Sequence, residues 1–176
     1  MAEVAAITMD TSQAALFAKH LQTAPQIVQE EITPALHEAL QLLEREIKDL
    51  TPVGVMGGGG LRGSITSELR GTAIDDLQGK VYSPMKHALP VEMGTKPHPV
   101  SREGQAAIRD WVEKILNVSP EESKSVAFLV VRKISKEGTE GAHMFEEGLS
   151  KNTRQILNML YAAQDRIVAR LQAGAR

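Results

Sequence analysis

The chain alternates between segments with helical spacing of apolar residues and shorter segments rich in turn residues. A first helix is predicted to begin near Asp10 and to end at Thr23. Apolar side chains then recur at three- and four-residue steps from Pro25 to Leu50, which predicts a long amphipathic helix. Because Pro34 lacks a backbone donor, we expect a kink or two abutting helices at that position.

The middle of the chain changes to short segments bounded by glycine and aspartate. Val53 to Gly60 contains four consecutive glycines and is predicted to be a flexible loop. Strands are predicted at Ser64 to Arg70, at Thr72 to Ile74 and at Lys80 to Tyr82. Leu89 to Met93 is predicted as a short extended segment at a sheet edge, since proline suits an edge strand. Short connections favour an antiparallel meander.

The second half of the chain is predicted to contain helices around one further strand. A helix is expected to follow its capping residue Ser101. Ser119 and the residues after it could start a short helix. Val126 to Val131 is apolar throughout and predicts a central strand. The last helix is predicted from about Phe145 or Leu149 to Leu171.

Together these elements predict an α+β fold. A small, mainly antiparallel sheet is packed by a long N-terminal helix, a middle helix and a long C-terminal helix. The length of 176 residues fits a single domain over residues 1–176. Within it, residues 1–24 form a possible helical appendage, and residues 53–60 form the flexible glycine loop.

Composition excludes several classes of function. The chain has no cysteine, which rules out thiol catalysis, disulfides and thiolate metal sites. Only 3% of its residues are aromatic and its net charge is −2, so a surface that binds DNA or RNA is not expected. No signal peptide or apolar run long enough to span a membrane is apparent. We therefore expect a soluble protein that is made and kept inside a cell, without membrane contact.

The glycine loop and the histidines are the candidates for catalytic chemistry. Gly58 to Ser64 has the outer glycines and final serine of a phosphate-binding loop, but it lacks the lysine and the preceding strand. His98 and His143 do not lie at metal-ligand spacing within one element. We expect no catalytic residue, metal or cofactor. The alternative is a small hydrolase or nucleotide-binding enzyme that uses the glycine loop with His98 or His143.

Three blocks of sequence follow one another in a distinctive order. The first comprises Thr51-Pro52-Val53-Gly54 and Gly60-Leu61-Arg62-Gly63-Ser64-Ile65, and the second is Val91-Glu92-Met93-Gly94-Thr95 after Val81-Tyr82-Ser83. The third is Ala142-His143-Met144-Phe145-Glu146. In this order, over about residues 36 to 171, the chain resembles the tail-completion or head–tail joining (minor tail) proteins of long-tailed bacteriophages.

The chain also departs from the pattern of that family. Residues Met56 to Gly59 lengthen the first block. In the second block the expected Tyr-Ala pair is displaced to Tyr82-Ser83 or replaced by His87-Ala88. The third block lacks the proline that precedes the aromatic residue in the family.

The resemblance implies a structural virion component without catalytic residues. It would assemble as a ring, expected to be a hexamer, at the head-proximal end of the tail. Its partners would be copies of itself, the tail tube protein and the head–tail connector, and DNA would pass through the ring without sequence-specific contact. It would be made in the cytoplasm of the bacterial host and located in the tail or neck of the virion.

A subunit or partner interface is the site that this hypothesis predicts. Ring closure needs a contact between different surfaces of neighbouring subunits, which a strand edge and a mobile arm can provide. Val91 to Thr95 is predicted to be the strand edge, and Gly57 to Gly60 is predicted to be the arm that orders on assembly. A further alternative is a toxin–antitoxin or regulatory helical module, although the chain lacks a basic face. The candidate interface residues are Gly57, Gly58, Gly59, Gly60, Leu61, Arg62, Val91, Glu92, Gly94 and Thr95.

Overall fold

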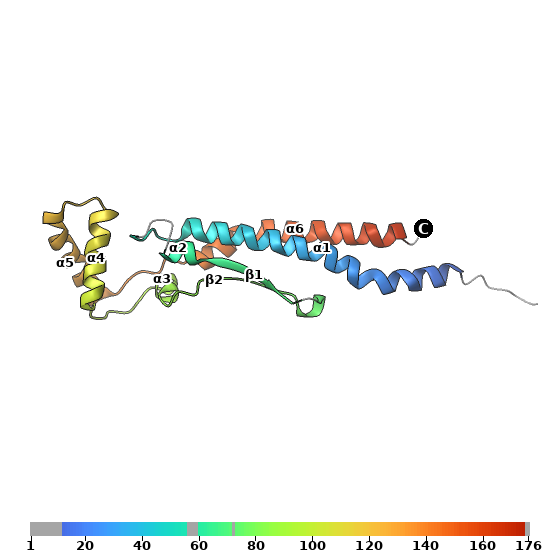
Figure 1. Ribbon diagram of the computed structural model, residues 1–176, viewed down its shortest axis with the longest axis horizontal. Helices are drawn as coiled ribbons and strands as arrows, with labels where there is room; N and C mark the ends of the chain where they lie inside the picture. The colour runs from blue at the N-terminus through green and yellow to red at the C-terminus, as the bar shows by residue number, and fades with distance from the viewer. Residues whose placement is uncertain (1–11, 56–59, 72, 175–176) are drawn as a thin grey trace, which may run out of the picture. The chain divides into compact units, whose positions relative to one another are not determined.

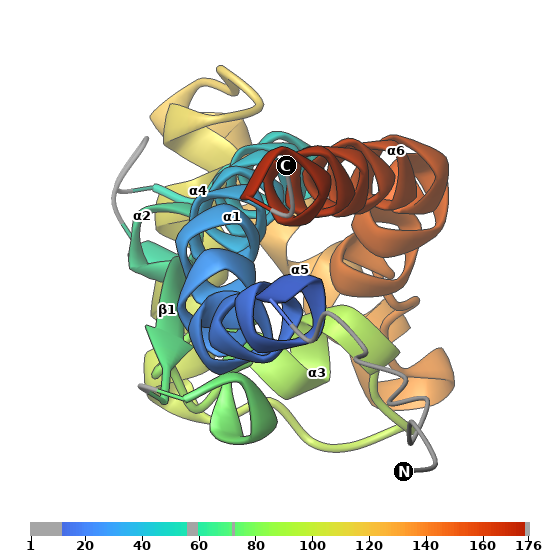
Figure 2. The ribbon, with the colours of Figure 1, turned by 90° about the vertical axis from the view of Figure 1, so that its right-hand side faces the viewer.

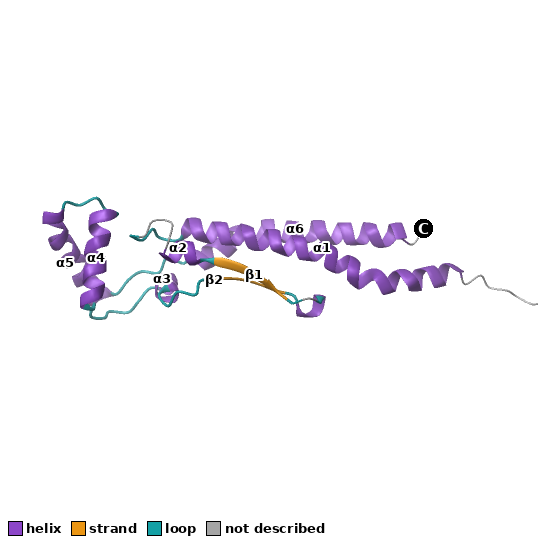
Figure 3. Cartoon of the chain, viewed as in Figure 1, coloured by secondary structure: helices purple, strands orange, loops and turns teal. Residues whose placement is uncertain are grey.

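The computed structural model describes residues 12–55, 60–71 and 73–174 of the chain (Figure 1). Over these residues it confirms a small α+β fold, 71% helical, with a two-stranded antiparallel sheet and long N- and C-terminal helices (Figure 3). The elements are α1 (Ser12–Leu50), α2 (Gly60–Ser64), β1 (Thr66–Arg70), the 3-10 helix η1 (Ile74–Asp76), β2 (Gln78–Tyr82), α3 (Ala88–Met93), α4 (Arg102–Lys114), α5 (Pro120–Glu137) and α6 (Met144–Gly174).

The chain divides into two compact units. The first contains the described residues of Met1–Ala39, Leu69–Gln78 and Gln155–Arg176, and the second contains those of Leu40–Glu68 and Gly79–Arg154. Helices α1 and α6 each contribute to both units.

Parts of α1 and α6 lie side by side in the first unit (Figures 1 and 2). Their buried side chains are small or aliphatic, namely Ala35, Ala39, Ala163 and Ile167. Ion pairs join the helices: Arg166 lies 2.7 Å from Glu31, and Arg170 lies 2.6 Å from Glu30 and 3.0 Å from Glu31. These pairs set the register of the two helices in this unit.

The second unit is built around a small aliphatic core. Ile47 of α1, Ile65 after α2 and Met144 of α6 are buried together. Hydrophobic burial of these side chains joins segments that are far apart in the sequence. Partly buried residues pack against them, namely Leu43, Leu50, Leu61, Val81, Val91 and Phe145.

The predicted break between a first helix and a second helix near Thr23 is wrong, because α1 is continuous there. It continues through Thr23, Pro25 and Pro34, which lie inside one helix. The side chain of Pro34 is exposed within this helix. Packing of buried Ala35 and Ala39 favours a continuous helix.

The predicted central strand at Val126 to Val131 is wrong, because these residues belong to α5. Ser119 caps this helix through the backbone N–H of Glu122, and Pro120 occupies its first turn. Among its residues Ala127 is buried, whereas Phe128 is 64% exposed. The apolar run therefore covers opposite sides of a helix and does not form a buried strand.

Two other predicted extended segments also differ. Leu89 to Met93 lies in α3, and Ile74, the described end of the predicted Thr72 to Ile74 strand, opens η1. Pro90 fits the first turn of α3, where its missing N–H leaves no helical bond unmade. The predicted strands at Ser64 to Arg70 and Lys80 to Tyr82 correspond to β1 and β2, although Ser64 itself ends α2.

Candidate assembly interface

Arg62 of the first block caps the carboxyl end of α1. Its guanidinium donates hydrogen bonds to the carbonyl of Thr51, at 3.2 Å from Nε and 2.7 Å from Nη2, and to the carbonyl of Asp49 at 3.4 Å. The last carbonyls of a helix lack backbone donors and carry a partial negative charge. A cation at this position therefore stabilises the end of α1.

Glu92 of the second block caps the amino end of α6. Its carboxylate accepts hydrogen bonds from the backbone N–H groups of Phe145 at 3.0 Å and Glu146 at 3.2 Å. These are first-turn amides of the helix, which have no carbonyl partner within it. The negative charge also lies at the positive end of the helix dipole.

Backbone hydrogen bonds join the second block to the segment before α6. The N–H of Ala142 donates to the carbonyl of Val91 at 2.8 Å. Thr95 and Thr139 form an isolated antiparallel bridge, with N···O distances of 2.9 and 3.1 Å. Their hydroxyl oxygens lie 2.9 Å apart. The second block is therefore bound along its length to residues more than forty positions away.

Two glycines allow this close approach. Gly94 has a φ of 75° and Gly138 a φ of 81°, in the region where side chains are disfavoured. A Cβ at Gly94 would meet the carbonyl oxygen of Thr139, and a Cβ at Gly138 would meet that of Thr95. Each glycine is thus required both by its backbone conformation and by the opposing backbone.

The prediction that Val91 to Thr95 forms a sheet edge is wrong. Val91 and Glu92 lie in α3, Gly94 ends that helix, and Thr95 pairs with Thr139. The apolar and β-branched residues suggested an extended segment, but the backbone groups here are used by the helix and by the bridge. The hypothesis of strand addition at this segment therefore loses its structural basis.

The three blocks meet in the core of the second unit. Leu61 of the first block, Val91 of the second and Phe145 of the third all pack against the buried cluster of Ile47, Ile65 and Met144. The structure thus brings together Leu61, Arg62, Val91, Glu92, Gly94 and Thr95 as parts of one unit, in which Arg62 and Glu92 hold the ends of the two long helices.

The glycine loop is only partly described. Gly57, Gly58 and Gly59 lie outside the described residues, and so does the predicted arm that they would form. Gly60 begins α2 with a φ of 63°. Leu61 and Arg62 follow it directly, so this end of the loop is attached to the core and to the end of α1.

Glu44 forms a polar cluster that the sequence did not indicate. Its carboxylate accepts hydrogen bonds from the backbone N–H and hydroxyl of Ser67, at 2.8 and 2.6 Å, and lies 2.6 Å from Lys48. The hydrogen bond from Lys48, followed by those from Ser67, lowers the pKa of Glu44. The cluster attaches β1 to α1, and no local spacing could have revealed a pair 23 residues apart.

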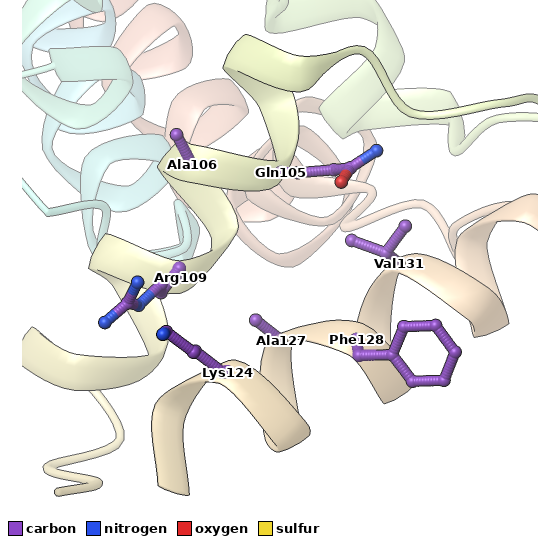
Figure 4. Close-up of a pocket in the computed structure, with 7 residues that line it drawn as sticks. All are labelled: Gln105, Ala106, Arg109, Lys124, Ala127, Phe128 and Val131. Atoms are coloured by element: carbon purple, nitrogen blue, oxygen red, sulfur yellow. The ribbon is translucent and has the colours of Figure 1, made fainter. Parts of the chain in front are cut away.

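A shallow pocket of about 400 Å³ lies between α4 and α5 (Figure 4). Ser123, which precedes the lining residue Lys124, is buried and donates to Glu113 at 2.6 Å, while Arg109 lies 3.0 Å from the same carboxylate. The hydrogen bond from Ser123 is the main cause of the lowered pKa of Glu113. This network joins the two helices and was not predicted. The pocket is lined by Gln105, Ala106, Arg109, Lys124, Ala127, Phe128 and Val131.

The two histidines of the enzyme alternative are exposed and have local partners. Nδ1 of His98 lies 2.9 Å from the carbonyl oxygen of Lys96, and Nδ1 of His143 lies 3.2 Å from the carboxylate of Glu146. Within residues 12–55, 60–71 and 73–174, no group of three histidine or acidic residues is placed to hold a metal ion. Within the same ranges, none of the helices has the length and apolar character needed to cross a membrane.

Comparisons of the chain with protein-family models, with curated proteins and with solved structures gave no match.

Proposed function

We propose that the protein is a structural component of a phage virion, which assembles as a ring at the head-proximal end of the tail and joins or completes it. The observation that carries this proposal is the meeting of the three family-like blocks in one unit. Leu61, Val91 and Phe145 contact the same buried cluster, although they come from segments far apart in the sequence.

The surface next to these blocks supports an assembly role. Leu89 is 69% exposed and Met93 is 65% exposed, one helical turn apart on α3. Val91 and Glu92 of the same short helix are engaged with the core and with α6. Helix α3 thus presents an apolar side to solvent while its other side is held rigidly, an arrangement that suits contact with another protein.

The assembly can be tested with two sets of variants. Native mass spectrometry of the wild-type protein is expected to give a closed oligomer, with a hexamer as the expected size. Deletion of Gly57 to Gly59 should leave the monomer folded, because Gly60 and the helix it begins are retained. The deletion should abolish ring closure, because it removes the proposed arm. Leu89→Ser combined with Met93→Ser should also abolish the ring, whereas Leu129→Ser on α5 is the matched control and should not.

The function itself is tested in the genome that encodes the chain. Genes for a capsid protein, a connector and a tail tube protein are expected beside it, and loss of the gene should yield separate heads and tails. The proposal would be overturned if the protein is a monomer at every concentration and its gene lies among metabolic genes. A rise of several degrees in melting temperature with nucleotides or divalent metals would favour the enzyme instead.

A further inference from the structure

The exposed side of α5 carries two large apolar side chains beside a cluster of cations. Phe128 is 64% exposed and Leu129 is 60% exposed. Lys124 lies one turn before Phe128 and Arg132 lies one turn after it, because about four residues complete a helical turn. Lys133 follows Leu129 at the same spacing. We call the following exposed residues the α5 face: Lys124, Phe128, Leu129, Arg132, Lys133 and Lys136.

The α5 face is separate from the side of the helix that packs within the chain. Ser123 and Ala127 are buried, and Ser123 donates a hydrogen bond to Glu113 of α4. At 3.6 residues per turn, Arg132 and Lys136 lie on the opposite side of α5 from that buried pair. Helices α4 and α5 both belong entirely to the second unit, so one unit contains the whole surface.

The four cations of the α5 face have no counter-ion in the described part of the chain. Among residues 12–55, 60–71 and 73–174, none of the four forms an ion pair, whereas Arg109 and Lys114 of α4 are both paired. The acidic residues of α5 lie in its first turn and at its last position. Arg132 and Lys136 repel each other, because like charges one turn apart are neighbours. An acidic partner would therefore relieve a repulsion within this helix.

Shallow hollows border the apolar pair on both sides. The pocket between α4 and α5 is bounded by Lys124 and Phe128 (Figure 4). A second hollow of about 410 Å³ is lined by Leu129, Ile134 and Glu140, among others. Phe128 and Leu129 thus stand between two hollows that can receive protruding side chains. The surface of a lipid bilayer has no such side chains, so the hollows favour a protein partner.

A helix suits this surface better than an extended segment does. The backbone groups of α4 and α5 are hydrogen-bonded within the helices, so they present no strand edge to which a peptide could add. Two helices instead pack by fitting rows of side chains into the grooves between them. Phe128 and Leu129 supply such a row, and the hollows beside them supply the grooves.

We infer that the α5 face binds an acidic amphipathic helix of another protein. Apolar side chains of that helix enter the hollows beside Phe128 and Leu129, and its carboxylates face the four cations. The apolar contacts supply most of the attraction, and the charges select an acidic partner over a basic one. This inference does not rest on the proposed function, because no residue of the α5 face belongs to the candidate ring contact.

Two synthetic helical peptides test the charge requirement. Both are about 18 residues long, which is enough to form a helix, and both carry leucines along one side. Glutamates flank the leucines in one peptide, and lysines flank them in the other. Fluorescence anisotropy at about 0.15 M salt measures binding of each labelled peptide to the full chain. The glutamate peptide is expected to bind at least about tenfold more tightly than the lysine peptide.

Charge reversal on the protein should invert this preference. Arg132→Glu combined with Lys133→Glu should weaken binding of the glutamate peptide at least about tenfold and make the lysine peptide the better ligand. The control combines Lys86→Glu with Arg154→Glu, which changes the net charge equally at exposed positions outside α5. It should keep the affinity for the glutamate peptide within about threefold of wild type.

The apolar pair is tested separately. Phe128→Ser combined with Leu129→Ser should also weaken binding of the glutamate peptide at least about tenfold, because it removes the side chains between the hollows. Leu149→Ser on α6 is the control, since Leu149 is 53% exposed and lies outside the α5 face. It should leave the affinity unchanged. Circular dichroism checks that every variant is folded.

The inference is overturned if the wild-type protein binds both peptides equally or binds neither, or if charge reversal on α5 leaves the preference unchanged. Binding to phosphatidylserine vesicles or to duplex DNA, without binding to the glutamate peptide, would also overturn it. Peptide binding should persist in the variant that lacks Gly57 to Gly59, and the ring should persist after charge reversal on α5. The two proposals can therefore fail separately.

Discussion

At the scale of single residues, the bridge between Thr95 and Thr139 depends on two glycines beside it. Gly94 and Gly138 both adopt positive φ, and each lies against a carbonyl of the opposing segment. A side chain at either position would have to displace backbone, which is much less adaptable than another side chain. These glycines are therefore among the least replaceable residues of the second unit.

Gly138→Ala is expected to lower the free energy of unfolding by at least about 2 kcal/mol, because it adds backbone strain and a contact with the carbonyl of Thr95. Urea unfolding followed by circular dichroism measures the change. Gly54→Ala is the matched control: a Cβ at that position meets nothing within 4 Å, and the change should stay within about 0.5 kcal/mol. Equal effects of the two substitutions would contradict this explanation.

The roles of individual polar residues were the part of the site least accessible from sequence. The family resemblance predicts Arg62 and Glu92 as interface residues. The structure gives each of them a capping contact with a helix end, to Thr51 and to Phe145 respectively. The second contact spans 53 residues, so no local pattern encodes it. Whether either residue also contacts another subunit stays a prediction.

At the scale of elements, the sequence predicts the starts of helices better than it predicts whether a short apolar segment is a strand or part of a helix. Ser101 accepts a hydrogen bond from the N–H of Gly104 at 3.1 Å, and Ser119 also caps a helix, as their positions suggested. The run from Val126 to Val131 predicts a strand because β-branched residues favour strands, and periodicity cannot separate a short apolar strand from the segment of α5 that it forms. Ser119 and Pro120, which precede this run, indicate the start of a helix more clearly than the apolar residues indicate a strand.

The ion pairs between α1 and α6 predict a response to pH. Hydrogen bonds from Arg170 and Arg166 are the main causes of the lowered pKa values of Glu30 and Glu31, which lie below their usual 4.5. A carboxyl whose pKa is lowered by folding stabilises the protein above that usual value, and this stabilisation is lost as the pH falls through the folded pKa. The melting temperature should therefore fall on acidification below about pH 4.5.

Arg170→Gln removes contacts with both glutamates and should flatten this acid-side fall in melting temperature, measured by thermal unfolding between neutral and acidic pH. The difference in melting temperature between wild type and Arg170→Gln should shrink in high salt, because Arg170 and Glu30 are exposed and their charges are screened. Lys114→Gln, which breaks only the exposed pair with Asp110 inside α4, is the control and should leave the pH profile unchanged. An unchanged profile for Arg170→Gln would refute the assignment.

At the scale of the whole molecule, the α+β class could be predicted because long amphipathic helices dominate the sequence. The sheet is smaller than predicted, with two strands, β1 and β2, in the described residues. The buried cluster of Ile47, Ile65 and Met144 could not be assembled from sequence, since its members come from three distant segments. Their shared burial depends on tertiary packing and not on any local preference.

Ile65→Ala should lower the free energy of unfolding by about 2–5 kcal/mol, because Ile65 is 1% exposed and its loss leaves a cavity in this small core. Chemical denaturation of the full chain measures the change. Leu129→Ala serves as the control, since Leu129 is 60% exposed and the expected change is about 0.5 kcal/mol or less. An equally large loss of stability in Leu129→Ala would show that burial of the side chain does not determine the effect.

The bridge between Thr95 and Thr139 has a consequence for modularity. The chain leaves at Thr95, forms α4 and α5, and returns at Thr139 to a point within hydrogen-bond distance of its departure. Residues 96–138 thus form an excursion with adjacent ends, which a short β-turn could replace. Neither the buried cluster nor the capping residues Arg62 and Glu92 lie within it. The helical pair is therefore a cassette that could be shortened, lengthened or exchanged while the remaining chain keeps its core and both helix caps.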